Sequence, residues 1–337
     1  MTYKEILNQI DKKILQPIYF LHGEEPYYID VISDYIEEHA IDPSERDFNQ
    51  TVLYGRDVKS NELFALAKGF PMMSNYQVIV VKEAQDIKPT EVFLELLATY
   101  LENPVKSTIL VFCHKYKKLD SRKKIAKTIQ SVGILFESAK IYDNQVPSWI
   151  QAFVKESGYR MGEKGALMLS EYVGNNLSRQ TNELTKLFIL TEKGDEITPD
   201  NIEKNIGISK DYNLFELYKS LGNKNHAVSF KIIDYFGQNL KENPPAKVIP
   251  ILFSFFNKIM ILHSLEAKTR ENIAKEVGVS PSFVQDYLTA ANNYPILKTI
   301  KVISILREYD LKSKGVEADQ ISGDQLLKEL IIKIAYA

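Results

Sequence analysis

The stretch IYFLHGEEPYYID, residues 18–30, sets the interpretation of the first half of the chain. Its first six residues form a short apolar run that ends at Gly23, a pattern typical of a buried strand. The segment from Glu24 to His39 then predicts a loop followed by a helix. Nucleotide-binding proteins carry their phosphate-binding loop between such a strand and helix, so this stretch bears on both fold and function.

The loop after this strand lacks the residues that bind phosphate. A GxxxxGK[ST] loop uses glycines so that backbone N–H groups can surround the phosphates, and a lysine that reaches the terminal ones. Here residues 22–29 read HGEEPYYI, without a GK[ST] pair. Glu24 and Glu25 would repel phosphate, and Pro26 removes an N–H donor. We therefore expect no ATP hydrolysis by this chain.

Working outward from this stretch, apolar runs alternate with helical patterns up to about residue 140. Further strands are expected at 47–54, 78–81, 108–113 and 134–136, and helices at 60–68, 90–101 and 120–131. Continuous apolar strands separated by helices indicate a parallel sheet covered on both faces. The fold class predicted for this part is therefore α/β.

From about residue 141 the strand signals stop and helical spacing takes over. Helices are expected at 146–157, 163–173 and 177–191, and Thr198-Pro199 is typical of a helix start. The segment 213–337 is again helical, interrupted near 243–245 and 294–295. We predict three domains: an α/β domain at 1–140, a small helical domain at 141–208 and a larger all-α domain at 209–337.

Composition excludes several classes of function. The net charge is -2, so the whole protein has no global attraction to nucleic acid or membrane. The five histidines show no metal-ligand spacing, and no GxSxG, CxxC or HExxH motif is present. We expect no catalytic residue, no metal and no cofactor.

The single cysteine, Cys113, is interpreted as a core residue. The most apolar stretch, 248–265, contains Pro250, Lys258 and His263 and is interpreted as a buried helix. Because the N-terminus has no apolar signal core, a cytoplasmic location is expected.

Several segments together resemble the delta subunit family of bacterial DNA polymerase III, the clamp-opening arm of the clamp loader. They are IYFLHGEEPYYID (18–30), FPMMSNYQVIVVKEAQ (70–85), ITPDNIEKNI (197–206), LFELYKSLGNKNHAVSFKII (214–233), IAKEVGVSPSFVQDYLTAANNY (273–294) and LREYDLKSKG (306–315). The resemblance covers nearly the whole chain. It implies an AAA+-like α/β domain without a working ATP site, a small helical lid and a helical collar domain that assembles with other subunits.

The resemblance also implies a clamp-binding element just before the third strand. The family's usual pair there is a leucine and a phenylalanine; this sequence departs from it with Met72 and Met73, and Phe70 takes the accompanying position. Methionine is flexible and polarisable, so it still suits an apolar pocket on a partner. The residues alone leave two readings open, because the Phe-Pro-Met-Met turn can be displayed as an interaction patch or can fold back over its own sheet.

Energetics set a further expectation for this element. Burying three such side chains yields roughly 5–9 kcal/mol gross, and association costs at least ~4 kcal/mol. A second contact surface or a stiff mounting is therefore expected if the turn is to hold a clamp tightly.

A basic cluster follows the fourth strand. Phosphate contacts are one interpretation of Lys115, Lys117, Lys118, Arg122 and Lys123, and a solvated helix face is the other. The position of this cluster resembles the one at which active AAA+ partner subunits carry a Ser-Arg-Cys arginine finger. Ser121-Arg122-Lys123 departs from that motif, and the role is not carried over.

Residues 271–288 imitate a DNA-reading helix-turn-helix, with Gly278 at the turn. A helix-turn-helix regulator is therefore one alternative function, although the second helix offers no Arg or Lys for phosphate or guanine. A divergent AAA+ ATPase is another. The partners that the family resemblance implies are the sliding clamp (beta subunit), the ATP-binding gamma/tau subunits, delta-prime and primed DNA within the complex, with no membrane.

Overall fold

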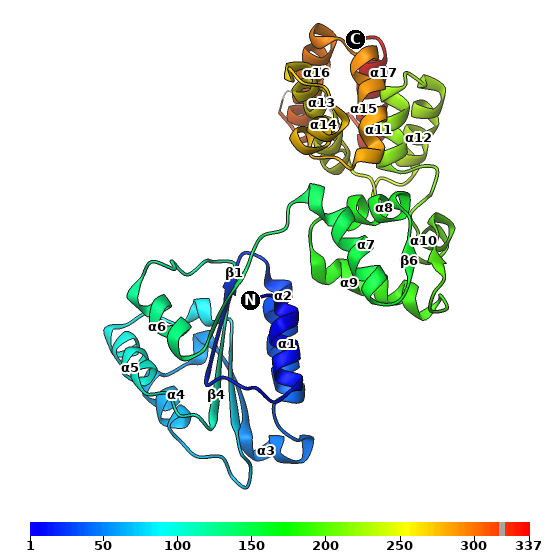
Figure 1. Ribbon diagram of the computed structural model, residues 1–337. Coiled ribbons are helices and arrows are strands. Elements are labelled where there is room, and N and C mark those ends of the chain that lie inside the picture. The colour runs from blue at the N-terminus through cyan, green and yellow to red at the C-terminus, as the bar shows by residue number, and fades with distance from the viewer. Residues whose placement is uncertain (317–320) are drawn as a thin grey trace. The chain divides into compact units, whose positions relative to one another are not determined.

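The structure, a computed structural model, describes residues 1–316 and 321–337 (Figure 1). Residues 317–320, part of the predicted helical segment 213–337, lie outside the described residues. The chain separates into two compact units, residues 1–141 and 142–337. The three-domain division made from the sequence stays a prediction.

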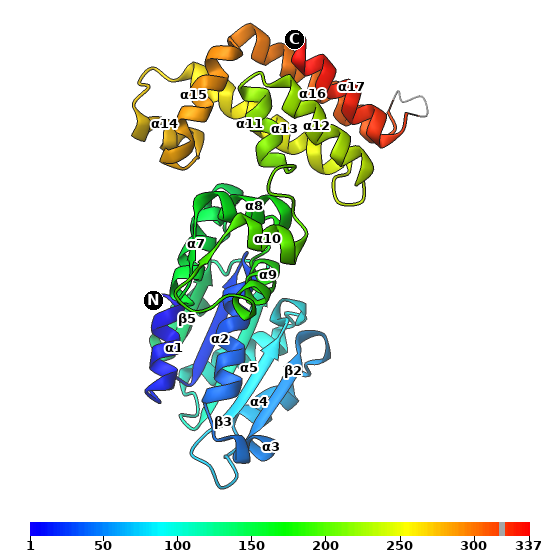
Figure 2. The same ribbon diagram turned by 90° about the vertical axis from the view of Figure 1, so that its right-hand side faces the viewer.

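A five-stranded parallel sheet forms the centre of the first unit (Figure 2). Its order is β2-β3-β4-β1-β5, with every neighbouring pair parallel. The strands are β1 (Ile18–Gly23), β2 (Gln50–Tyr54), β3 (Gln77–Lys82), β4 (Thr108–Lys115) and β5 (Ile134–Ser138). The central strands β1, β3 and β4 are buried almost throughout, because helices cover both faces of the sheet. The α/β prediction for this part is confirmed.

Alternate strand residues divide this unit into two apolar cores. One core joins Tyr19, Leu21 and Val111 to helices α1 (Tyr3–Asp11) and α2 (Pro26–His39). The other joins the intervening strand residues, such as Phe20 and Phe112, to α4 (Ser60–Ala67), α5 (Glu91–Glu102) and α6 (Lys124–Val132). The short elements η1 (Pro43–Glu45), α3 (Arg46–Asn49), η2 (Gly55–Asp57) and η3 (Ala84–Asp86) complete the unit.

Two features of the first unit differ from the sequence predictions. Helix α1 was not predicted, although Thr2 and Glu5 form a capping box at its start. The predicted helix 120–131 begins only at Lys124, because Asp120 and Ser121 belong to a turn.

The second unit opens with η4 (Asp143–Gln145), α7 (Val146–Glu156), α8 (Glu163–Val173), α9 (Leu177–Ile189) and α10 (Pro199–Ile206). Thr198 caps α10 by accepting a hydrogen bond from the Asn201 N–H, with Pro199 in the first turn, as predicted. The prediction that strands end near residue 141 is wrong. β6 (Arg160–Met161) and β7 (Glu196–Ile197) pair in parallel, but two residues each are too few to show a period-2 pattern.

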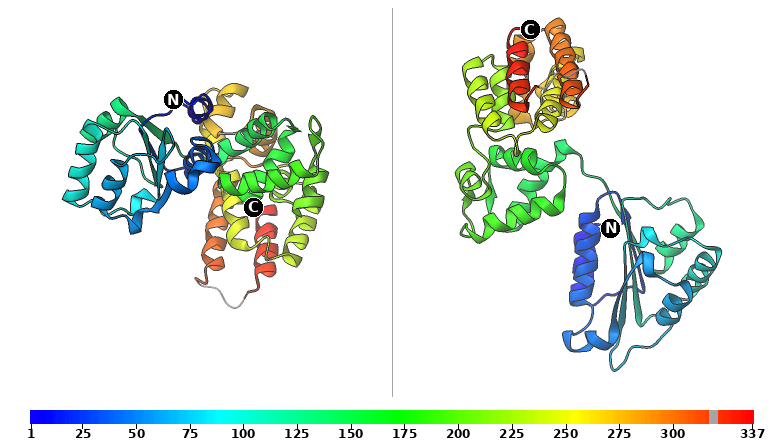
Figure 3. Two further views of the ribbon diagram at one scale, coloured as in Figure 1. Left: turned by 90° about the horizontal axis from the view of Figure 1, so that it is seen from below. Right: turned by 180° about the vertical axis from the view of Figure 1, so that it is seen from behind.

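The remaining helices share one large apolar core (Figure 3). They are α11 (Leu214–Gly222), α12 (His226–Gln238), α13 (Pro245–Ser264), α14 (Arg270–Val277), η5 (Pro281–Phe283), α15 (Val284–Asn293), α16 (Ile296–Ser313) and α17 (Gly323–Ala335). Helix α13 is long and apolar enough to cross a membrane. Leu252, Phe256 and Ile259 on it are nevertheless buried against the other helices, as in the core helix of a helical domain.

Candidate functional site

The loop between α4 and β3, residues 68–75, is called the tip loop here. Lys68 caps the end of α4, and the Gly69 N–H donates to the Leu66 carbonyl, which closes the last turn. The loop lies at the amino-terminal ends of the parallel strands, because β3 begins two residues later at Gln77. The loop between β1 and α2 lies at their carboxyl-terminal ends. The two candidate regions of the first unit therefore occupy opposite edges of the sheet.

The tip loop displays three large apolar side chains to solvent. Phe70 is 85% exposed, Met72 62% and Met73 100%. Met73 also has a φ of 53°, a left-handed conformation that is uncommon for a residue other than glycine. Such backbone strain is most often found where function requires it. The side chains therefore form a displayed patch and do not fold back over the sheet.

One buried side chain holds the backbone of the loop from both directions. Asn49, at the end of α3, is 5% exposed. Its Oδ1 accepts from the Met72 N–H at 2.6 Å, and its Nδ2 donates to the Met72 carbonyl at 2.9 Å. Nearby, the Ser74 hydroxyl donates to Glu45 at 2.6 Å. These bonds fix the direction in which Met72 and Met73 leave the protein.

The base of the loop is fixed by a second polar group at the start of β3. The Gln77 Nε2 donates to the Gly69 carbonyl at 2.9 Å and to the Thr108 hydroxyl at 2.8 Å. Thr108 in turn donates to the Ala67 carbonyl at 2.9 Å. Buried polar groups that are fully hydrogen-bonded give a segment one conformation. The stiff mounting expected from the energetics is thus present.

At the opposite edge of the sheet, a carboxylate occupies the helix end that would bind phosphate. Glu25 caps α2 by accepting from the Tyr27 N–H at 3.0 Å, and Pro26 fills the first turn. Burial raises the pKa of Glu25. Backbone N–H groups at a helix N-terminus are the donors that phosphate uses. Because Glu25 takes one of them and Pro26 has none, this edge is closed to a nucleotide phosphate.

The carboxyl-end edge is further filled by ion pairs. The Lys115 Nζ lies 2.7 Å from Asp30 and 2.9 Å from Glu83. The Lys82 Nζ lies 2.7 Å from Asp34 and 2.7 Å from Glu37. Glu83 thus serves as a partner for lysine. Within residues 1–316 and 321–337, no group of three or more His, Cys, Asp or Glu side chains is arranged to hold a metal ion.

Comparison with known proteins agrees with these features. Residues 19–139 match the family model described as DNA polymerase III, delta subunit. The Bacillus subtilis (strain 168) DNA polymerase III subunit delta is 24% identical over 337 residues, covering 97% of this chain and 95% of the relative. The solved structure of the Bacillus subtilis DNA clamp loader delta protein (YqeN) is 22% identical, with a TM-score of 0.60 and complete coverage of both chains.

The chain is therefore similar to the DNA polymerase III delta subunit, both over residues 19–139 and along nearly its whole length. The predicted fold class, an α/β part followed by an all-α part, is confirmed by the five-stranded parallel sheet and by the fold of the matching solved structure. The delta subunit, to which this chain is similar, is a non-catalytic accessory subunit of the polymerase III holoenzyme.

The predicted basic cluster of this chain is largely neutralised by ion pairs. Lys115 is buried between two carboxylates, Lys118 lies 2.9 Å from Glu137, and Arg122 pairs with Asp120 at 3.0 Å. Lys117 and Lys123 are exposed. DNA contact by this cluster stays a prediction, and these pairs favour the interpretation as a solvated surface.

Residues 271–288, which resemble a helix-turn-helix in sequence, pack against other helices of the second unit. Gly278, with a φ of 66°, ends α14 in the left-handed conformation that such a turn requires. The hydroxyls of Ser280 and Ser282 donate to Glu163 at the start of α8. Val284 and Tyr287 on the second helix are buried in the core. These contacts argue against a freely presented recognition helix.

Replacing Asn49 with alanine tests the mounting of the tip loop. Because both hydrogen bonds to the Met72 backbone are lost, Asn49→Ala should weaken clamp binding by about tenfold through the cost of ordering a looser loop. It should lower the free energy of unfolding by about 1–3 kcal/mol. Surface plasmon resonance and urea unfolding would measure the two effects. Clamp affinity equal to that of the wild type would show that the loop needs no such support.

Proposed function

We propose that this protein is the clamp-loader subunit that binds and opens the sliding clamp for loading onto primed DNA. Similarity to the DNA polymerase III delta subunit supports the role in the clamp loader. The contact residues are Phe70, Met72 and Met73, which insert into an apolar pocket on the clamp. The departure from the family's leucine and phenylalanine changes the shape of the inserted group and keeps its apolar character.

The observation that carries this proposal is an exposed apolar patch on a loop that is hydrogen-bonded from beneath. A contiguous apolar patch at the surface of a soluble protein commonly marks a binding site. Rigidity matters, because a loop already ordered in the free protein loses less conformational entropy on binding. The hydrogen bonds from Asn49 and Gln77 therefore raise the share of the apolar burial energy that remains as affinity.

The mechanism is mechanical and not catalytic. Docking of the tip loop opens the clamp to the extent that the loop binds the open ring more tightly than the closed one. Because the Glu25 cap closes this chain's own phosphate site, ATP binding by the gamma/tau subunits has to drive the cycle. Delta-prime and primed DNA are the other partners in the assembly. The all-α region 209–337 acts as the collar that joins the subunits. The complex is cytoplasmic.

A direct binding measurement tests the proposal. The full chain, passed over the immobilised sliding clamp of its source bacterium in surface plasmon resonance, should give a saturable, concentration-dependent signal. The clamp should be shown to be an intact ring by analytical ultracentrifugation before immobilisation. Absence of binding to such a ring would refute the proposed function.

A further inference from the structure

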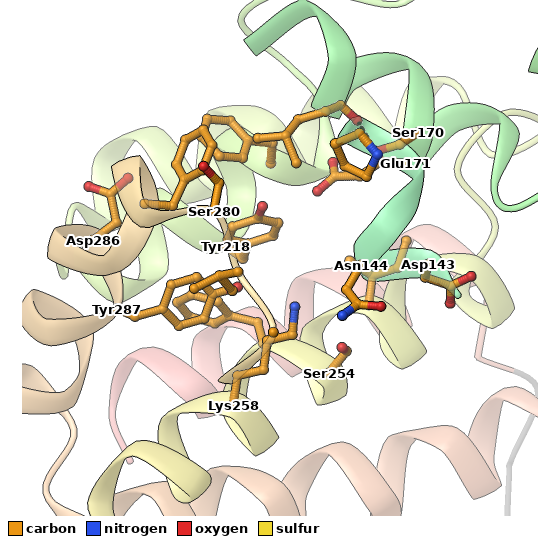
Figure 4. Close-up of a pocket in the computed structure, with 18 of the residues that line it drawn as sticks. Asp143, Asn144, Ser170, Glu171, Tyr218, Ser254, Lys258, Ser280, Asp286 and Tyr287 are labelled. Carbon is orange, nitrogen blue, oxygen red and sulfur yellow. Dashed lines mark hydrogen bonds between the residues drawn. The ribbon is translucent and has the colours of Figure 1, made fainter. Parts of the chain in front are cut away.

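The second unit contains a large cavity that the clamp contact does not use (Figure 4). Its volume is about 550 Å³, within the range of small-molecule sites. Residues from η4, α7, α8, α11, α13 and α15 line it, together with the turn after α14. All of them belong to the unit 142–337, so its walls are held by one compact body.

Glu171 supplies to this cavity a carboxyl group of which one oxygen has no hydrogen-bond partner. Its Oε2 is shielded from solvent and has no hydrogen-bond partner among the described residues. Burial raises its pKa to about 8, although hydrogen bonds from the Tyr218 hydroxyl and the Phe215 N–H partly oppose the shift. A buried polar atom without a partner is costly, and such exceptions in a folded protein need an explanation. A bound donor would supply the missing hydrogen bond.

Lys258 lies in the same cavity without an ion pair. Figure 4 shows its amine and the Glu171 carboxyl group both pointing into the open space. Within residues 1–316 and 321–337, no carboxylate oxygen lies within 4.0 Å of its Nζ, and burial lowers its pKa. Other charged groups of the cavity are already engaged, since Lys219 pairs with Asp286 and Glu163 accepts from Ser280. Asp143 is exposed to solvent, and the Lys258 Nζ lies 5.9 Å from the centre of the Tyr287 ring. Glu171 and Lys258 are therefore the buried or partly buried charged groups that a ligand would meet.

The composition of the wall favours a flat cation. The lining contains four acidic residues, Asp143, Glu163, Glu171 and Asp286, and two basic ones, Lys219 and Lys258. Aromatic rings surround the space, from Phe215, Tyr218, Phe255, Phe283 and Tyr287. Aromatic faces attract organic cations, and a carboxylate matches the paired N–H groups of an amidinium or guanidinium.

We propose that this cavity binds a small planar organic cation, an amidinium or guanidinium attached to a flat apolar body, with the cation on Glu171. The N–H groups of the ligand donate to the Glu171 carboxylate, which turns its Oε2 toward the cavity, and the flat body packs among the aromatic rings. Lys258 opposes the ligand by charge and tunes its affinity. The site is independent of the proposed clamp contact.

Isothermal titration of the full chain with benzamidine tests this site. Saturable binding at pH 8.5 is expected. Glu171→Gln should weaken it by tenfold or more, because the charge-assisted hydrogen bond is lost. Lys258→Met should strengthen it several-fold. Circular dichroism and the melting temperature should show that both variants are folded. If Glu171→Gln does not fold, the pH dependence of benzamidine binding to the wild type still decides, since binding that is no tighter at pH 8.5 than at pH 6.5 would overturn the proposal.

Two further probes test which features of the ligand the cavity recognises, its charge and its flat body. Benzoate has the same flat body with the opposite charge, and it should bind more weakly than benzamidine; tighter binding of benzoate would overturn the assignment. L-argininamide carries the planar cation without an aromatic body and should also bind more weakly. Argininamide binding equal to that of benzamidine would overturn the need for a flat body and point to an arginine side chain of a partner protein.

The affinity should also depend on pH in a defined direction. Because the ligand needs ionised Glu171, benzamidine should bind more tightly at pH 8.5 than at pH 6.5. Ionisable groups that face Glu171 from neighbouring helices are Tyr218 on α11, Lys247 and Lys258 on α13, and Tyr287 and Asp286 on α15. The Lys258→Met variant should keep the pH dependence. Its loss in that variant would show that Lys258, and not Glu171, is the titrating partner.

Discussion

Met72→Ala combined with Met73→Ala should reduce binding to the sliding clamp by 100-fold or more. Each buried methionine contributes about 1.5–3 kcal/mol, so removing both side chains forfeits at least about 3 kcal/mol. Surface plasmon resonance with the full chain would measure the loss. The fold should be unaffected, because both side chains are exposed and the hydrogen bonds of Asn49 involve only the Met72 backbone.

A matched control for this double variant lies in the second unit. Ile189 and Leu190, at the end of α9, are also adjacent, apolar and exposed. Ile189→Ala with Leu190→Ala removes a similar apolar area and should leave clamp affinity unchanged. If the Met72/Met73 double variant bound the clamp as the wild type does, the assignment of the site would be wrong, while the similarity to delta subunits would be unaffected.

Raising the pH from about 5 to 8 should destabilise the wild-type second unit relative to Glu171→Gln. The pKa of Glu171 is about 8 in the folded protein, above the ordinary value of 4.5. Between these values the folded state holds a proton that the unfolded chain has released, so stability is lost as the pH rises. The wild type should lose up to about 1.4 kcal/mol per pH unit in this window. Glutamine cannot ionise and should lack this contribution.

The quantity to measure is the difference in stability between the wild type and Glu171→Gln, because other groups titrate over the same pH range in both. Calorimetric melting of both at pH 5, 6, 7 and 8 would show whether the advantage of Glu171→Gln grows with pH. An advantage that stays constant over this series would mean that Glu171 is ionised in the folded protein throughout. It would also remove the expected pH dependence of benzamidine binding.

The sequence predicts the central strands of the sheet well, because β1, β3 and β4 are buried on both faces and appear as unbroken apolar runs. Val78 to Val81 is the clearest case. The missing phosphate loop was equally readable, since Glu24, Glu25 and Pro26 contradict the motif residue by residue. The two-residue strands β6 and β7 were beyond such reasoning, because no periodicity can be defined over two positions.

The tip loop was predictable only in part. Phe70, Met72 and Met73 stand out because an apolar turn is unusual. Asn49 and Gln77, which hold the loop, could not be found in this way. Asn49 lies 23 residues before Met72, and the two meet only because β2 and β3 pair in the folded sheet. Glu171 was missed for a similar reason, since α8 looks like an ordinary amphipathic helix until α11 and α13 pack around it.

The burial of the single cysteine has a practical consequence for fluorescence work. Cys113 lies inside β4 with no exposed surface, and burial raises its pKa to about 12, so thiol reagents will not reach it. A cysteine introduced at Asn75, the last residue of the tip loop, would therefore be the only reactive thiol in the chain. The fluorescence of a dye attached there would report binding of the sliding clamp, without any prior removal of native cysteines.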